Sequence, residues 1–169
     1  ASTDVLLGLP GESRESHLNT LRKVFELGFD MIDVGNIRLL PGSEMESDEA
    51  REEYQLQTKY RLISGGYGRY HDKPVFEYEE SVRGSKDISE PEMHSLRIVH
   101  FFIWALSNLG IAKPLFRWFQ LEHGRNPLDL MLSLATSGKD VMLDEFLVEF
   151  DEEAREEWFD TAQDLTDFY

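Results

Sequence analysis

The chain has 169 residues, 41% of them hydrophobic, and 17 Lys and Arg against 33 Asp and Glu give it a net charge of −16. This size supports one or two small domains with a buried core. The negative charge argues against a nucleic-acid partner or an anionic membrane, and no apolar run is long enough to span a bilayer. Because the chain has no cysteine, its own residues cannot form a disulfide, a thiolate metal site or a cysteine-bound iron–sulfur cluster.

The start of the chain has the pattern of a parallel βαβ unit. Asp4 to Leu9 is almost continuously apolar and predicts a buried strand, Ser13 to Gly28 has helical spacing, and Asp30 to Leu39 predicts a second strand. A strand–helix–strand unit of this length forms a right-handed crossover between parallel strands. Since a buried strand begins so close to Ala1, we expect the chain to be a piece of a longer protein.

The middle of the chain has weaker signals. A short helix is expected from Ser47 to about Leu56. Residues 57–88 are expected to be irregular, with a loop at Gly65 to Gly68 and an edge strand at Val75 to Glu79.

The remainder of the chain is predicted to be helical from its capping residues. Ser89 to Glu92 is a capping box, and Asn126-Pro127 is an N-cap followed by proline. Helices are expected over 89–110, 114–124 and 127–138, followed by one that begins at Asp140 and another at Asp151. Residues 140–169 contain 12 acidic residues and one basic residue but keep a helical apolar stripe, so this segment should pack against the protein. We therefore predict an α+β fold with an α/β start, divided into residues 1–88 and a helical extension, 89–169.

The most specific string is Leu7 to Ser13, Leu-Gly-Leu-Pro-Gly-Glu-Ser, at the junction between the first strand and its helix. Backbone N–H groups, glycines and the positive end of the helix dipole meet there, as they do in many ligand sites of α/β proteins. Turn chemistry by itself favours an ordinary βα turn with Ser13 as the N-cap.

This string, followed by Leu39 to Glu44, resembles the end of a radical S-adenosylmethionine barrel. In that family a GLPGE[ST] turn follows the fifth strand of a partial (β/α)₆ barrel, and LLPG[ST]E commonly follows the sixth strand in members with a cobalamin-binding domain. The resemblance is good over residues 4–48 and weaker over residues 59–70.

The resemblance implies roles for five residues in binding S-adenosylmethionine. Leu6 would contact the adenine, Gly8 would permit close approach, and Glu12 would brace the turn through backbone hydrogen bonds. Asn36 and Arg38 share one face of the second strand, and their side chains would point into the barrel mouth. An exposed strand end would place the same two side chains in solvent, and the sequence leaves these alternatives open.

The chain departs from the family in lacking the three cysteines that bind the [4Fe–4S] cluster. The resemblance therefore implies a C-terminal part that is inactive alone, in a cytoplasmic oxidoreductase or methyltransferase whose other part holds the cluster and, in the subgroup with a cobalamin-binding domain, cobalamin. The missing part of the barrel would be its partner. We also expect the isolated chain to cover its two strands with its own helices or to form a homo-oligomer.

The alternative function is a helical protein-interaction or regulatory module on a βαβ scaffold without catalysis. It predicts an exposed aromatic groove on the helices and no open site near Gly8. No protein metal site is expected, because the five histidines lack zinc-binding spacing, and no catalytic residue is assigned. In particular, His94 and His100 lie six residues apart, on different faces of their helix.

Overall fold

The computed structural model describes residues 1–136, 138 and 140–169 and confirms an α+β fold with a parallel βαβ start. The strands β1 (Ser2–Leu7) and β2 (Met31–Asn36) pair in parallel and are connected by the helix α1 (Arg14–Leu27). Ser13 caps α1, and Gly28 ends it in the left-handed conformation, as its sequence predicts. The first strand begins and ends two residues earlier than expected, and β2 is shorter than expected because residues 37–39 leave it and pair with a later strand.

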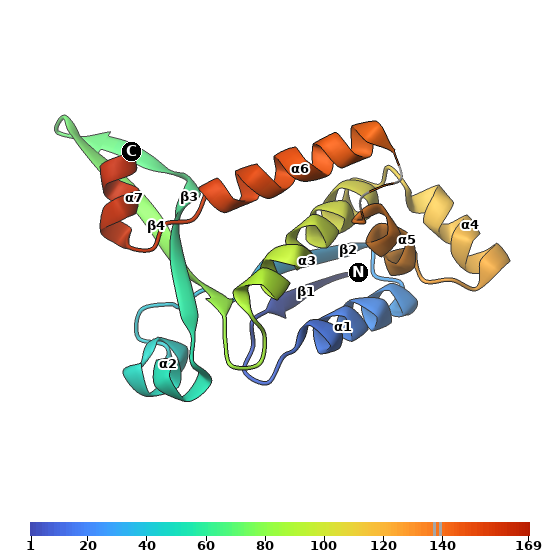
Figure 1. Ribbon diagram of the computed structural model, residues 1–169, viewed down its shortest axis with the longest axis horizontal. Coiled ribbons are helices and arrows are strands. Elements are labelled where there is room, and N and C mark those ends of the chain that lie inside the picture. Colours follow the sequence, from blue (N-terminus) through green and yellow to red (C-terminus); the bar gives the residue numbers. More distant parts are fainter. Residues whose placement is uncertain (137, 139) are drawn as a thin grey trace.

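The prediction that residues 57–88 are irregular was wrong, although a strand does cover Val75 to Glu79 as expected. After a 3₁₀ turn (Glu44–Glu46) and the short helix α2 (Asp48–Tyr54), the chain forms a long antiparallel hairpin of β3 (Gln57–Tyr70) and β4 (Lys73–Gly84). The predicted glycine loop lies inside β3, where a register shift between Leu62 and Tyr67 accommodates it. The true turn is His71-Asp72, both with positive φ, which suits a two-residue hairpin. Figure 1 shows the hairpin extending away from the β1–β2 sheet and the helices around it, with the last helix beside its upper part.

Helices form the rest of the chain, with most of the predicted caps in place. They are α3 (Glu90–Phe102), which continues as the π-helical segment η2 (Ile103–Asn108), then α4 (Lys113–His123), α5 (Pro127–Leu134), α6 (Val141–Glu156) and α7 (Ala162–Phe168). No helix was found to begin at Asp151. This residue lies inside α6, where its carboxylate binds Arg155 one turn later, and the last helix begins instead after Thr161.

The larger of two apolar clusters in the described residues joins the βαβ unit to the later helices. The inward side chains of β1 and β2 pack against α1, α3 and α5, with Val5, Ile32, Leu21, Val99 and Leu128 at its centre. In Figure 1, α1 and α3 lie beside the β1–β2 sheet, and α6 crosses from the hairpin to α5. The apolar stripe of α6 packs against this core through Leu143, Phe146 and Leu147, which confirms that the acidic segment is packed.

The helices of the described segments include none that is both long and apolar enough to cross a membrane alone. One bent pair, Glu90–Asn108 with Lys113–His123 at 97°, has sufficient combined length and apolar composition.

Candidate functional site

The turn between β1 and α1 is organised by the carboxylate of Glu12. One oxygen accepts hydrogen bonds from the N–H of Gly8 (2.7 Å) and of Leu9 (3.4 Å), and the other contacts Nδ1 of His17 (2.9 Å). Burial acts to raise the pKa of Glu12, but the hydrogen bonds from His17 and Gly8 outweigh burial and leave this pKa below its ordinary value. An ionised Glu12 therefore braces the turn, as its place in the motif predicts.

Gly8 is buried, and the chain's own side chains make the close approach there. It has φ of +100°, and a Cβ at this position would lie 3.2 Å from Val82 of β4 and from Met93 of α3. The resemblance implies that Gly8 permits close approach, and in the structure the groups that approach it are these two side chains of the same chain. Gly8 packs toward the core, and neither Gly8 nor Glu12 lines the hollow on the other face of the sheet.

The face of the β1–β2 sheet opposite the core is open and forms a shallow hollow of about 540 Å³. Three of the five predicted site residues, Leu6, Asn36 and Arg38, line this hollow together with Asp4 and Asp33. The side chain of Leu6 is 48% exposed. The structure thus brings these three residues to one hollow, where the apolar side chain of Leu6 lies among polar and charged residues.

The polar side chains of Asn36 and Arg38 have partners on β4. The Asn36 amide donates to the carbonyl of Val82 (3.0 Å), and the Arg38 guanidinium pairs with Glu79 (2.6 Å) while remaining 56% exposed. These partners could not be predicted, because the pairing of the hairpin that supplies them was not recognised. Arg38 keeps enough exposed surface to bind a further anionic group.

A hydrogen-bonded chain leads from the turn into the protein. Nε2 of His17 lies 2.9 Å from Nε2 of His100, so that Glu12, His17 and His100 form a continuous line. Burial, together with the nearby His17 and Arg97, lowers the pKa of His100 to about 3. His100 is therefore neutral at pH 7, and sequence reasoning missed this cluster because its two histidines are 83 residues apart.

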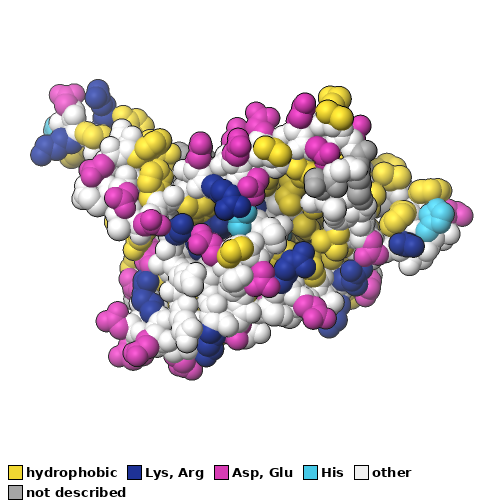
Figure 2. Space-filling view, viewed as in Figure 1, with side chains coloured by type: hydrophobic (Ala, Val, Ile, Leu, Met, Phe, Trp, Pro, Cys, Tyr) yellow, Lys and Arg dark blue, Asp and Glu magenta, His cyan; other side chains and the backbone are white. Residues whose placement is uncertain are grey.

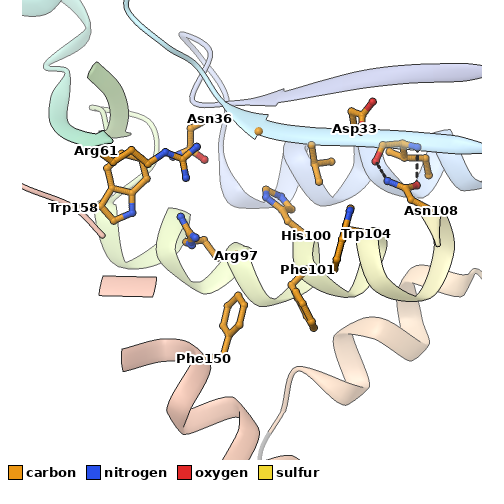
Figure 3. Close-up of a pocket in the computed structure, with 13 residues that line it drawn as sticks. Asp33, Asn36, Arg61, Arg97, His100, Phe101, Trp104, Asn108, Phe150 and Trp158 are labelled. Carbon is orange, nitrogen blue, oxygen red and sulfur yellow. Dashed lines mark hydrogen bonds between the residues drawn. The ribbon is translucent and has the colours of Figure 1, made fainter. Parts of the chain in front are cut away.

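His100 lines a second cavity, of about 310 Å³, between β2, α3 and the segment after α6 (Figure 3). At one end of this cavity lie Arg61, Arg97 and Trp158, which we call the arginine end. Along its side lie Phe101, Trp104 and Phe150, which we call the aromatic wall. Figure 3 shows His100 between these two groups and the Asp33 carboxylate pointing away from His100, on the other side of β2.

Known proteins give no guide to either site. A scan of the chain against models of protein families matched none, and a search of curated proteins found no significant match. Within the described residues there is also no group of three His, Asp or Glu side chains that could hold a metal ion.

Proposed function

We propose that the chain is the C-terminal part of a cytoplasmic radical S-adenosylmethionine enzyme and supplies the last two strands of its catalytic barrel. The observation that carries this proposal is the asymmetry of the β1–β2 sheet. Its β2 side is closed by the chain's own residues, whereas β1 has no second neighbour in the described structure. Strands that precede β1 in a barrel would pair at this open edge.

The closure at β2 is specific. The Asn108 amide at the end of η2 accepts from the Ile32 N–H and donates to the Ile32 carbonyl, at 3.0 and 2.9 Å. Beyond β2, Ile37 and Leu39 continue the ladder onto β4 through backbone hydrogen bonds of 2.9 and 2.8 Å. Contacts at Ile32, Ile37 and Leu39 therefore obstruct this side, whereas β1 offers its whole length to a further strand.

The open face supports the same proposal. Parallel sheets are normally covered on both faces, yet here the helices cover one face and leave Leu6 and Met31 exposed on the other. In a barrel this second face would be the interior. Leu6 would contact the adenine of S-adenosylmethionine, and Arg38 at the rim would bind its carboxylate or the substrate.

The iron–sulfur cluster belongs to the other part of such an enzyme, because this chain contains no thiolate ligand. When bound there, the cluster supplies the electron that cleaves S-adenosylmethionine, and cobalamin would serve methyl transfer. The residues of this chain position the cofactor: Leu6 provides an apolar contact, Gly35 leaves room beside it, and Glu12 fixes the turn. The residues that select the substrate would lie on the other walls of the barrel.

The first test is the coding sequence upstream of Ala1. A CxxxCxxC string about 100–150 residues before Gly8 is expected from the length of four βα units. The longer chain, purified without oxygen, should bind S-adenosylmethionine and form 5′-deoxyadenosine. Leu6→Glu should weaken that binding at least about tenfold, because it buries a charge against the adenine. The matched control is Leu27→Glu, at an exposed position at the end of α1.

The absence of the cysteine string, or equal binding by both leucine variants, would refute the assignment.

A second candidate function, a protein-interaction module, is favoured by the exposed apolar side of α4. Leu115, Trp118 and Leu121 are all about half or more exposed, and Figure 2 shows hydrophobic side chains on the projection that α4 forms. Such a strip is typical of an interface between subunits. Light scattering tests it: Leu121→Glu should reduce the mass of a homo-oligomer, whereas a wild-type chain that is monomeric at high concentration contradicts the homo-oligomer.

A further inference from the structure

The arginine end of the cavity holds more positive than negative charge. Arg38 and Arg61 share Glu79, and Arg61 and Arg97 share Glu157, so that three guanidiniums contact two carboxylates. This excess is unusual in a chain whose net charge is −16.

A fourth arginine, Arg83 of β4, adds a buried charge behind this end. It is 2% exposed, and its Nε and Nη1 atoms have no hydrogen-bond partner among the described residues. The two acids whose charges act on it are held by other cations, Glu90 by Lys59 and Glu157 by Arg61 and Arg97. Burial and the repulsion from Arg97 lower the pKa of Arg83 to about 10, so it stays charged at pH 7.

The indole of Trp158 compensates these charges only in part. Three guanidiniums surround its ring, with Arg83 at 4.4 Å, Arg61 at 4.8 Å and Arg97 at 5.9 Å from the centroid. Cation–π contacts offset only a part of the free-energy cost of burying an unpaired ion. An anion in the adjoining cavity would supply the missing compensation.

The rest of the cavity sets the shape of that anion. The aromatic wall is a continuous surface, with ring centroids 5.3 Å apart for Phe101 and Phe150 and 5.9 Å for Phe101 and Trp104. His100 adds a neutral, fixed imidazole, because His17 and Glu12 hold it from behind. A volume of about 310 Å³ is at the small end of ligand cavities.

We propose that this cavity binds a small organic acid, with its carboxylate or phosphate group at the arginine end and a flat apolar body along the aromatic wall. Arg61 and Arg97 are 31% and 22% exposed, so both guanidiniums keep surface that a ligand can contact. Two guanidiniums suit the two oxygens of one such group. This cavity adjoins the open hollow of the sheet, with residues 33–36 of β2 lining both, but the proposal does not depend on the radical chemistry proposed above.

The three tryptophans provide an internal test. Trp104 and Trp158 line the cavity, whereas Trp118 lies on the exposed side of α4. Titration of the full chain with 4-fluorobenzoate or 4-fluorophenyl phosphate should shift the indole N–H signals of Trp104 and Trp158 in ¹H–¹⁵N spectra and leave that of Trp118 in place. Neutral 4-fluorobenzyl alcohol should bind at least about tenfold more weakly than the better acid, because it lacks the charge-assisted hydrogen bonds.

A charge-removing variant tests the arginine end. Arg97→Gln should weaken the binding of 4-fluorobenzoate at least about tenfold, and Arg97→Lys should weaken it less. The matched control is Arg117→Gln on the exposed surface of α4, which should bind as the wild type does. If circular dichroism shows that Arg97→Gln does not fold, Arg61→Gln and the neutral alcohol still test whether positive charge at the arginine end is needed for binding.

Stronger binding of the phosphate than of the carboxylate, or the reverse, supports the site and identifies the preferred group. The proposal is overturned if neither acid shifts the cavity tryptophans, if the alcohol binds equally well, or if binding is unchanged in the folded charge-removing variants.

Discussion

Acid should destabilise this protein through His100, well above the pH at which carboxylates titrate. The folded chain holds the pKa of His100 at about 3, whereas an unfolded histidine has a pKa of about 6.5. Below pH 6.5 the unfolded state therefore gains a proton that the folded state does not, and the equilibrium shifts toward unfolding. The groups that keep His100 neutral are its buried position, His17 from α1 and Arg97 on its own helix.

The size of the effect follows from the pKa difference. Each pH unit below 6.5 costs about 1.4 kcal/mol, so acidification from pH 7.5 to 5.0 should lower the free energy of unfolding by about 2 kcal/mol through this residue. Urea denaturation followed by tryptophan fluorescence at the two pH values measures the loss. His94, whose pKa burial also lowers, adds to it in the same direction.

The variant His100→Gln separates the two histidines. It removes the titrating group, so its loss of stability between pH 7.5 and 5.0 should be about 2 kcal/mol smaller than that of the wild type. Its lower stability at pH 7.5, from the lost contact with His17, does not enter this difference. Equal losses in the two proteins would show that His100 titrates normally in the folded state, and the buried line from Glu12 would then be wrong.

Three further substitutions test the packing around the turn and the sheet edge, each by urea denaturation. Gly8→Ala should lower the free energy of unfolding by about 2–4 kcal/mol, because the new Cβ combines a positive φ with contacts of 3.2 Å. The control Gly11→Ala, which has a positive φ but open space around it, should lower it by about 1 kcal/mol. Equal losses in the two variants would contradict the packing at Gly8. Glu12→Ala should cost about 2–3 kcal/mol, since it leaves a part-buried N–H and His17 without their acceptor, and a loss within error of zero would refute the brace. Asn108→Ala should lower the free energy of unfolding by about 1–3 kcal/mol and speed hydrogen exchange at the Ile32 amide, because both hydrogen bonds to the Ile32 backbone are lost. Unchanged exchange at Ile32 would contradict the role of Asn108 at the sheet edge.

The helices and the βαβ unit could be predicted because their signals are local. Ser13 and Asn126 cap helices with their own side chains, and Gly28 and Gly124 end helices with positive φ. Each signal acts within one turn of the chain, where residue type and backbone geometry determine each other directly. The parallel pairing of β1 and β2 follows from the length of the helix between them.

The hairpin and the start of the last helix could not be predicted in the same way. Gly65 reads as a loop residue, but a bulge against β4 accommodates it within β3, and the pairing of these two strands was not predicted. Asp151 reads as a cap, but its partners Arg155 and His94 keep it inside α6. In both cases a contact from elsewhere in the fold overrides the local preference.

The amino-acid sequence by itself determined the βαβ unit, most of the helices, the turn held by Glu12 and the absence of thiolate chemistry, because these depend on neighbouring residues or on composition. Only the tertiary structure decided that His17 meets His100 and that, among the described residues, Arg83 is buried without an ion pair and β1 has a free edge. These features depend on which surfaces pack together, and a buried charge or an unpaired strand has no local pattern that marks it. The physical reason is that packing joins residues far apart in the chain, whereas capping and turn signals extend over only a few residues.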